Sequence, residues 1–328
     1  MQHPELAHPH DLLVRCFLTD PELMADLLQY YPQKVADQQM VKLLNLKHLE
    51  CKSPITVDER LVERIGDLRY SASFKGSKRL SNVFLLLEHQ SEIDQDFRLR
   101  GLDYIIQSFK EFRKTKKGRQ KLPYPVCVVL YHGKVQWKHL PKMDELIDIA
   151  PGAKTGLLDY QLILIDISVL SKDQFKGHPV LQAVLEALQL ASEGRLAKEL
   201  DRVIARLLAV KNDRRIRNWL APFAKYAMSV AKIGVEQIVQ AFSKLINEKE
   251  ARNMAMTTAQ ELILEGEAKG EIRGEKNAIL RFLEGRFGKV PKTIRDTVNS
   301  YNDLTALQSL SVSAGSCKSL DEFSDCLR

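Results

Sequence analysis

The strongest constraint on the fold is an unbroken apolar run, Val83 to Leu87, that ends in the polar triplet Glu88-His89-Gln90. A continuous apolar run of this length predicts a strand that is buried on both faces, because a half-exposed strand would alternate apolar and polar residues. Such a strand needs helices on both sides of its sheet. About twenty residues earlier, Gly66-Asp67-Leu68-Arg69-Tyr70 predicts a neighbouring strand, and the two form a predicted hairpin.

Both strands of this hairpin carry an acidic residue next to apolar sequence. A carboxylate at the end of a buried strand is costly to desolvate unless it is paired or binds a metal. Glu88 and Gln90 face the same side, because side chains alternate along a strand. With Asp67 they predict an oxygen-rich cluster suited to a hard cation, Mg²⁺ or Mn²⁺. A structural carboxylate pair, balanced by arginines such as Arg64 or Arg69, is the open alternative.

If the cluster binds a metal, each residue has a predicted part in phosphodiester hydrolysis. Asp67 is the central ligand, and Glu88 completes the coordination together with the backbone carbonyl of His89. Gln90 positions the attacking water or a phosphate oxygen. A third acid is expected from a nearby helix, with Asp11 as the candidate; its rivals, which the sequence does not separate from it, are Glu59 and Glu63.

The remaining hydrophobic patterns predict an α/β fold, with a mixed sheet flanked by helices and followed by a helical C-terminal region. Two short helices are expected between His10 and Tyr31, with a new helix starting at Asp20-Pro21. Further strands are expected near 46–55, 67–74, 126–131 and 161–167, and further helices near 97–114, 180–190, 196–210, 219–228 and 235–246.

Four segments are predicted from these patterns. Residues 1–178 form the sheet-containing core, 179–256 a helical extension packed on it, 257–277 a charged helical linker that contains glycines, and 278–328 a small helical domain. The linker glycines at 266, 270 and 274 lie on one helix face. The polar surroundings argue against a membrane dimer motif, so a linker or a weak self-association helix is expected, which allows a homo-oligomer through the C-terminal helical region.

Composition excludes several classes of protein. The 328 residues are 45% hydrophobic and 28% charged, and no stretch approaches the length of a membrane span. The start of the sequence lacks the pattern of a secretory signal, so a cytoplasmic protein without membrane contact is expected. Five scattered cysteines predict neither disulfides nor a zinc site, and motifs for nucleotide hydrolysis, serine esterases and zincins are absent.

The net charge of +7 permits binding to a polyanion. Seven basic residues crowd between Lys110 and Lys121, and a second cluster surrounds Arg215. Counterion release from DNA phosphates would give such a patch affinity, whereas a solvated helix end is the plainer interpretation. The predicted DNA-contacting residues are Arg113, Lys114, Lys116, Lys117 and Arg119.

The chain resembles the Rpn family of recombination-promoting nucleases, also labelled putative transposases, of the PD-(D/E)XK nuclease superfamily. The similarity spans nearly the whole chain, and its most specific block is Leu85-Leu86-Leu87-Glu88-His89-Gln90-Ser91. The other matching segments are His10-Asp11 with Phe17, Glu63-Arg64-Ile65-Gly66-Asp67-Leu68-Arg69-Tyr70, Leu130-Tyr131-His132-Gly133 with Trp137, and Arg281-Phe282-Leu283-Glu284-Gly285-Arg286-Phe287-Gly288.

This resemblance implies a restriction-endonuclease-like core and metal-dependent cleavage of DNA. In the superfamily pattern Asp67 matches the first acid, Glu88 matches the second, and Gln90 stands where a lysine is usual. Glutamine orients water but supplies no positive charge to a transition state. That charge would then come from elsewhere, with Arg69 or Lys75 as the expected sources.

Three functional hypotheses follow. The first is a Mg²⁺-dependent DNA endonuclease that promotes recombination or acts on mobile or foreign DNA. The second is a catalytically inactive DNA-binding or recombination accessory protein that retains the fold. The third is an interaction protein that acts through its C-terminal helices and uses the sheet as a scaffold.

Overall fold

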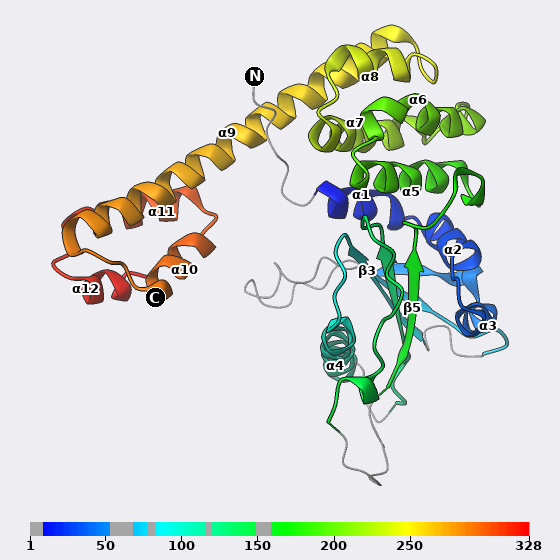
Figure 1. Cartoon of the computed structure of the whole chain (residues 1–328), viewed down its shortest axis with the longest axis horizontal. Coiled ribbons are helices and arrows are strands. Elements are labelled where there is room, and N and C mark those ends of the chain that lie inside the picture. Colours follow the sequence, from blue (N-terminus) through cyan, green and yellow to red (C-terminus); the bar gives the residue numbers. More distant parts are fainter. Residues whose placement is uncertain (1–8, 53–67, 78–82, 116–119, 149–158, 328) are drawn as a thin grey trace. The chain divides into compact units, whose positions relative to one another are not determined.

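The computed structural model of the chain describes residues 9–52, 68–77, 83–115, 120–148 and 159–327 (Figure 1). They belong to two compact units: a sheet unit, His8–Met256, and a C-terminal unit, Thr257–Arg328. Along the described residues, no helix combines the length and the apolar character that crossing a lipid bilayer requires.

The sheet unit is built on a mixed sheet of five strands in the order β1-β2-β3-β4-β5. Strand β2 runs antiparallel to both of its neighbours, β1 and β3, whereas β3, β4 and β5 are mutually parallel. The predicted α/β fold with a mixed sheet and flanking helices is confirmed. The strands are β1 (Glu50–Lys52), β2 (Leu68–Ala72), β3 (Val83–Gln90), β4 (Tyr124–Tyr131) and β5 (Gln161–Asp166).

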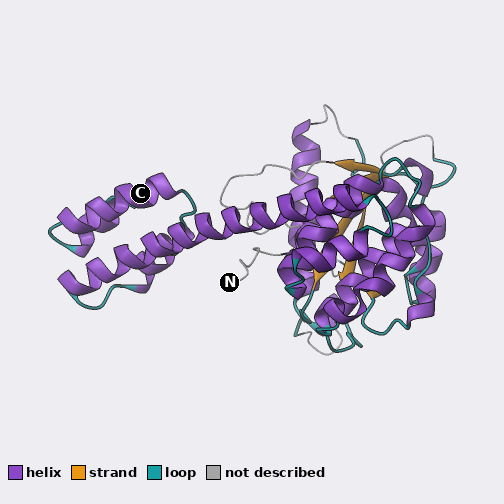
Figure 2. Ribbon diagram, turned by 90° about the horizontal axis from the view of Figure 1, so that it is seen from above, coloured by secondary structure: helices purple, strands orange, loops and turns teal. Residues whose placement is uncertain are grey.

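Helix α4 (Phe97–Thr115) connects the parallel strands β3 and β4 and covers one face of the sheet. Figure 1 shows α4 on one side of the strands, and Figure 2 shows the same elements from above. The helix runs back along β3, because its Phe112 contacts Phe84 near the start of the strand and its Arg100 contacts Glu88 near the end. The core under α4 consists of Leu86, Phe97, Ile105, Cys127, Val129, Tyr131, Trp137, Leu140, Leu162 and Leu164.

The opposite face of the sheet packs against the N-terminal helices and α5. Tyr70 of β2 donates a hydrogen bond to the carbonyl of Leu18 at the end of α1. Asp20 caps the next helix by accepting a bond from the backbone N–H of Glu22, so the predicted break at Asp20 is confirmed. The N-terminal helices are α1 (Pro9–Leu18), α2 (Pro21–Tyr30) and α3 (Val35–Leu43).

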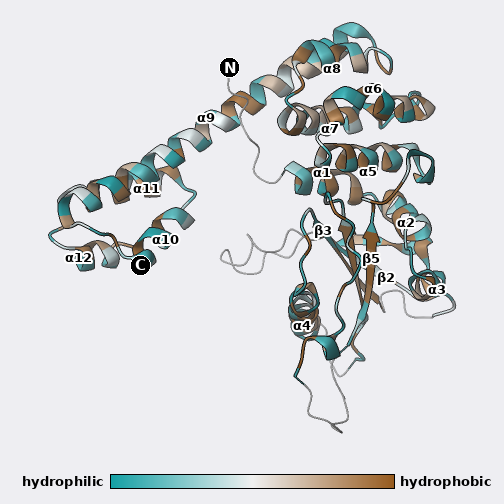
Figure 3. Ribbon diagram, in the orientation of Figure 1, coloured by the Kyte–Doolittle hydropathy of each residue, from teal (hydrophilic) through white to brown (hydrophobic). Residues whose placement is uncertain are grey.

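Beyond β5 the sheet unit is helical, and Figure 1 shows these helices stacked in layers. Helix α5 is rich in apolar residues and is buried along most of its length. Figure 3 shows the hydropathy of the residues in these helices. The buried Glu186 of α5 is paired with Arg202 and Arg206 of the next helix. The helices are α5 (Pro179–Ser192), α6 (Leu196–Leu207), α7 (Ile216–Ala231) and α8 (Val235–Phe242).

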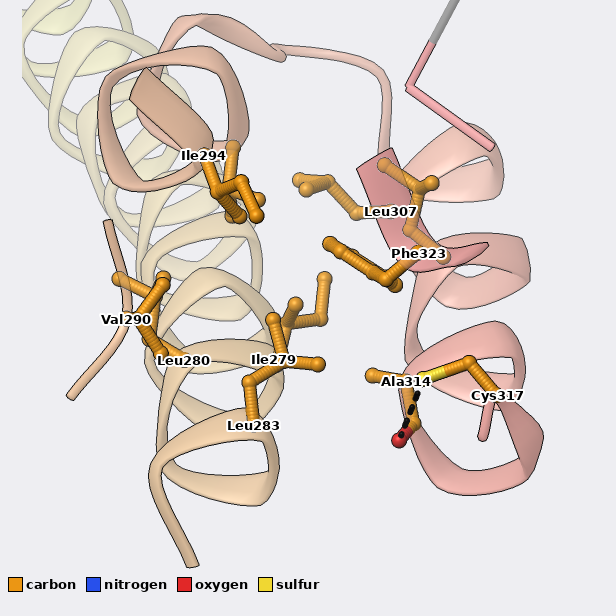
Figure 4. Packing of buried hydrophobic residues seen from close by; sticks show 11 residues of the cluster. Ile279, Leu280, Leu283, Val290, Ile294, Leu307, Ala314, Cys317 and Phe323 are labelled. Carbon is orange, nitrogen blue, oxygen red and sulfur yellow. Dashed lines mark hydrogen bonds between the residues drawn. The ribbon is translucent and has the colours of Figure 1, made fainter. Parts of the chain in front are cut away.

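The long helix α9 (Glu248–Phe287) contains the whole of the predicted linker 257–277. Within the C-terminal unit it packs with three short helices around an apolar core that includes Ile279, Leu283 and Phe323 (Figure 4). Phe282 lies outside this core: its side chain is 53% exposed, because it lies about 100° around the helix from Leu283. The short helices are α10 (Lys292–Ser300), α11 (Leu304–Ser316) and α12 (Leu320–Asp325).

Two residues of the segment Arg281 to Gly288 stabilise helix ends in this unit. Gly288 ends α9 with a positive φ of 79°, which glycine adopts at little cost, and its N–H bonds the carbonyl of Glu284. Arg286 donates hydrogen bonds to the carbonyls of Ala314 and Cys317 at the end of α11, at 2.7 and 2.6 Å. The segment therefore has a structural role here, and self-association through this unit stays a prediction.

Candidate functional site

Glu88 is the charged residue that β3 places at its carboxyl end. The strand is apolar up to Leu87, and Glu88 is 9% exposed although it carries a carboxylate. Its Oε1 accepts a hydrogen bond from the side-chain amide of Gln90 at 2.6 Å and lies 2.7 Å from Nη2 of Arg100. A buried carboxylate is tolerated only with such compensation. The predicted pairing of Glu88 and Gln90 on one face of the strand is therefore seen directly.

Arg100 was not among the residues singled out from the sequence. It lies in the first half of α4, where its guanidinium is shared between two carboxylates. Besides Glu88 it pairs with Asp94, Nη1 to Oδ2 at 3.0 Å, and it stacks over the ring of Phe97 at 5.1 Å. The loop between β3 and α4 thus brings a second acid, Asp94, to the same cation. The site contains positive charge, and it comes from the helix rather than from position 90.

The two cations expected from the sequence do not pair with Glu88 in this structure, and their proposed part in catalysis stays a prediction. Arg69 pairs with Glu111 at 3.1 Å, and Glu111 lies eleven residues beyond Arg100 on α4, a distance of about 16 Å along the helix. Lys75 follows the end of β2 where Ala72 pairs with Val83. Five residues of β3 separate that point from Glu88, about 17 Å along the strand.

Asp67, the predicted central metal ligand, lies outside the described residues. Glu59 and Glu63, the rivals of Asp11 for the third acid, also lie outside them. The described strands nevertheless fix the register next to it. Leu68, which follows Asp67 in the chain, pairs with Leu87, which precedes Glu88. The role of Asp67 stays a prediction that this register supports.

His89 points to the other face of the sheet, away from Glu88, because side chains alternate along β3. Its ring joins a histidine cluster formed by His10, His89 and His132. The Nε2 atoms of His89 and His132 are 2.6 Å apart, so one nitrogen donates a hydrogen bond to the other. The ring of His10 lies 4.8 Å from that of His132, and its Nδ1 is 2.9 Å from the hydroxyl of Tyr226 in α7.

The histidine cluster is neutral at pH 7. Burial lowers the pKa of His132 to about 2, with further lowering from His89 and His10, and burial lowers the pKa of His89 to about 3. Burial also lowers the pKa of His10. His132 is completely buried and bonds to His89 through Nε2. These rings join β3 and β4 to α1 and α7.

A cavity of about 690 Å³ adjoins the histidine cluster. His10, Ser91, His132, Lys134 and Ser192 contribute to its walls, whereas Glu88 and Gln90 do not. It lies at the carboxyl ends of the parallel strands β3 and β4, the edge of an α/β sheet where ligands commonly bind.

The other predicted site residues are more scattered. Asp11 lies on α1 and pairs with Arg15 of the same helix at 3.1 Å; its neighbour His10 is the residue of α1 that joins the histidine cluster. Arg113 and Lys114 end α4, about 20 Å along the helix from Arg100. Lys116, Lys117 and Arg119 lie outside the described residues.

A divalent cation fits the charge and chemistry of this strand end but needs ligands beyond those described. Glu88 offers a shielded carboxylate with a hard oxygen donor, and a guanidinium already occupies the place of a cation beside it. No group of three or more acidic, histidine or cysteine side chains among the described residues could hold a metal. The fit therefore depends on Asp67 together with the backbone carbonyl of His89.

Sequence reasoning missed Arg100, Asp94 and the assembly of three histidines. One feature of the sequence could have identified Arg100 and Asp94: both lie within twelve residues of Glu88, on the loop and helix that follow its strand. The histidines had no comparable signal, since His10 and Tyr226 are 216 residues apart and meet only through the fold.

Comparison with known proteins gives a consistent family. The family model described as "Putative transposase, YhgA-like" matches residues 8–217. Two relatives are named recombination-promoting nucleases: RpnD of Escherichia coli O157:H7, 27% identical over 55% of this chain, and RpnA of Escherichia coli K12, 27% identical over 66%. A third, from the K12 strain, is the "Inactive recombination-promoting nuclease-like protein RpnE", 24% identical over 58% of this chain.

The matched regions also span part of each relative's own length: 60% of RpnE, 66% of RpnD and 72% of RpnA. A further relative of Escherichia coli K12, over 29% of this chain, is also named as putatively inactive. No solved structure matches the chain significantly.

Proposed function

The chain belongs to the YhgA-like putative transposase family, and on that premise we propose that it is a divalent-metal-dependent DNA endonuclease that promotes recombination or acts on mobile or foreign DNA. The observation that carries this proposal is the buried Glu88 at the end of β3, held by Gln90 and balanced by Arg100. A carboxylate this well shielded, at the edge of the sheet where ligands bind, is placed for chemistry more than for stability.

In the proposed reaction, Asp67, Glu88 and the backbone carbonyl of His89 would hold Mg²⁺ or Mn²⁺. When bound there, such an ion would polarise the phosphoryl group and lower the pKa of the attacking water. The amide of Gln90 fixes the orientation of the Glu88 carboxylate, to which it donates at 2.6 Å, and its carbonyl oxygen is available to orient water. Asp11 stays the proposed third acid.

DNA is the proposed partner. Its backbone would contact the basic end of α4, where Arg113 and Lys114 precede Lys116, Lys117 and Arg119 in the chain. The distance of about 20 Å from Arg113 to Arg100 along α4 corresponds to about six base pairs, so one duplex could contact both ends of the helix.

The direct test is nicking of supercoiled plasmid by the full chain with Mg²⁺, compared with Glu88→Gln and Asp67→Asn. We expect nicking by the unmodified protein that disappears with EDTA and falls strongly in both variants. A Gln90→Lys variant, which restores the residue usual in the superfamily, is expected to retain or raise the rate. Equal nicking by all four proteins would refute the assignment.

A second function, a DNA-binding protein without cleavage activity, is favoured by one feature of the same site. Both Gln90 and Arg100 already engage Glu88, and two of the relatives are named as inactive. This alternative expects DNA binding that weakens steeply with salt, no nicking with Mg²⁺ or Mn²⁺, and unchanged binding in Glu88→Gln.

A further inference from the structure

The cavity beside the histidine cluster has fixed walls. One wall is the loop from His132 to Val135, which follows β4. The backbone N–H of His132 donates to the carbonyl of Gln90 at 3.1 Å, and the hydroxyl of Ser192 donates to the carbonyl of His132. The hydroxyl of Tyr131 donates to the carbonyl of Val135 at 2.6 Å. The loop is therefore bonded at both ends, and the protein itself holds the space of about 690 Å³ open.

His10 offers a hydrogen-bond donor to this cavity. The side chain of Tyr226 is 2% exposed, and the described partner of its hydroxyl is Nδ1 of His10 at 2.9 Å. A buried hydroxyl needs an acceptor for its proton, so it donates to Nδ1. The neutral ring of His10 then carries its own proton on Nε2. Since His10 lines the cavity, this N–H is the group that it can offer to a ligand.

Side chains of opposite charge and of apolar character also line the cavity. Lys134 comes from the loop after β4 and Glu92 from the loop after β3, and both are exposed. A second acid of the walls, Glu193, already pairs with an arginine at 2.6 Å. Ile93 and Val135 add apolar surface, since they are 38% and 66% exposed. The cavity thus suits a ligand that combines an anionic group, hydrogen-bonding atoms and an apolar body.

We propose that this cavity binds a nucleotide, with the phosphate at Lys134 and the base against Ile93 and Val135. A nucleobase has apolar faces and a polar edge that both donates and accepts hydrogen bonds. The N–H of His10 would donate to a ring nitrogen of the base, and Glu92 would accept a bond from an amino group. A simple anion would be repelled by Glu92 and a simple cation by Lys134, whereas a nucleotide offers a partner to each. The inference goes beyond the proposed function and needs no metal ion.

The first test is isothermal titration of the full chain in EDTA with deoxyadenylate and with deoxyadenosine, which lacks the phosphate. Lys134→Gln is expected to weaken binding of deoxyadenylate about tenfold and to leave that of deoxyadenosine unchanged, because only the phosphate contact is lost. Lys138→Gln alters an exposed lysine outside the cavity walls and is the control. If Lys134→Gln and Lys138→Gln bind deoxyadenylate equally well, the assignment of the phosphate is overturned.

A second variant tests the contact with the base. Val135→Asp is expected to weaken binding of deoxyadenylate and deoxyadenosine alike by about tenfold, because a charge replaces apolar surface. Val169→Asp alters another exposed valine, which lies outside the cavity walls, and is the matched control. Urea unfolding checks that both variants fold. If Val135→Asp binds both ligands as Val169→Asp does, or if inorganic phosphate binds as tightly as deoxyadenylate, the nucleotide site is overturned.

Competition distinguishes the two sources of such a ligand. If the nucleotide belongs to an unpaired DNA strand, oligodeoxyadenylate displaces deoxyadenylate, and Lys134→Gln weakens both. If the ligand is a free nucleotide, the oligomer does not displace it. If the unmodified protein binds neither probe, the inference is overturned, whereas plasmid nicking and its loss in Glu88→Gln still test the proposed function separately.

Discussion

Two buried glutamates of the sheet unit are both paired with arginine, yet they differ in their charge balance. Glu186 of α5 is fully buried, lies 2.6 Å from Nε of Arg202 and also pairs with Arg206. Its ion pairs extend to a network of three carboxylates and three guanidiniums, formed by Glu186, Glu193, Glu199, Arg195, Arg202 and Arg206. Around Glu88, by contrast, the ion pairs between described residues join two carboxylates, Glu88 and Asp94, to one guanidinium.

This difference distinguishes a structural ion pair from a candidate site. The network of Glu186 is balanced and closed between two packed helices, so removing one member leaves buried charge without compensation. The described ion pairs around Glu88 are fewer and lie at the edge of a sheet, where ligands commonly bind. Burial alone does not separate the two cases, since both carboxylates are below 10% exposed.

The largest expected effect is on nicking activity, and it tests whether Glu88, in contrast to Glu186, belongs to a functional site. Glu88→Gln is expected to lower the rate of plasmid nicking by about 100-fold or more, because charge stabilisation in the transition state is lost. Glu186→Gln, assayed at a temperature where it stays folded, is expected to nick within about threefold of the unmodified protein. If the two variants lose activity equally, the comparison between a site and a structural pair fails.

For the free energy of unfolding, the comparison predicts the opposite order, with a larger loss in Glu186→Gln than in Glu88→Gln. Glu186→Gln is expected to reduce the free energy of unfolding by about 3–5 kcal/mol, since two guanidiniums lose their buried partner. Glu88→Gln is expected to change it by less than about 1 kcal/mol in EDTA, because Arg100 keeps Asp94. Urea unfolding followed by tryptophan fluorescence measures this in the sheet unit, where Trp137 and Trp219 both lie.

A triple replacement sharpens the stability test. Glu186→Met combined with Arg202→Leu and Arg206→Met removes the charges together, and it is expected to recover most of the lost stability. If it is no more stable than Glu186→Gln, the loss comes from packing rather than from unpaired charge.

The histidine cluster behind Glu88 predicts a smaller effect, which depends on pH. The pKa of His132 is about 2 in the folded protein and near 6.5 when the residue is free, so only the unfolded chain takes up the proton as pH falls below about 6.5. The contribution of His132 to the stability of the sheet unit in EDTA is therefore expected to fall by about 2 kcal/mol between pH 7 and pH 5.

Two variants test whether His132 causes this pH dependence of stability. His132→Asn removes one titrating ring and is expected to make the profile shallower, although it lowers the stability at pH 7. The remaining slope comes in part from His89, whose pKa is about 3. His139→Asn, which alters an exposed histidine of the same unit, is expected to leave the profile unchanged. A profile that stays equally steep in His132→Asn would show that other groups control the acid sensitivity.

The sequence predicted the fold and only part of the site, for physical reasons. Local patterns are sufficient for the apolar strand β3, the helix start at Asp20 and the face shared by Glu88 and Gln90, since these depend on neighbours in the chain. The charge partners are not local. Arg69 and Lys75 were expected near Glu88 because they are close to Asp67 in the sequence, but the return of α4 along β3 brings Arg100 there instead.

The smallest expected effect concerns the basic end of α4, about 20 Å from Glu88 along the helix. If Arg113 contacts a phosphate, Arg113→Gln should lower the slope of log binding constant against log salt concentration by about 0.9 and weaken DNA binding by less than about tenfold. Its guanidinium now bonds the carbonyl of Gln120 at 2.6 Å, an exposed contact that DNA can replace. Electrophoretic mobility shifts across a salt series measure the slope.

Arg217 provides the matched control for this last comparison. It is also an exposed arginine, near a helix start rather than a helix end, and its guanidinium pairs with the carboxylate of Glu250. An arginine whose charge is already neutralised releases no counterion from DNA. Arg217→Gln is therefore expected to leave the salt slope unchanged. If Arg217→Gln lowers the slope and Arg113→Gln does not, DNA binds the helical layers instead of α4, and the distance between its backbone and Glu88 must be reconsidered.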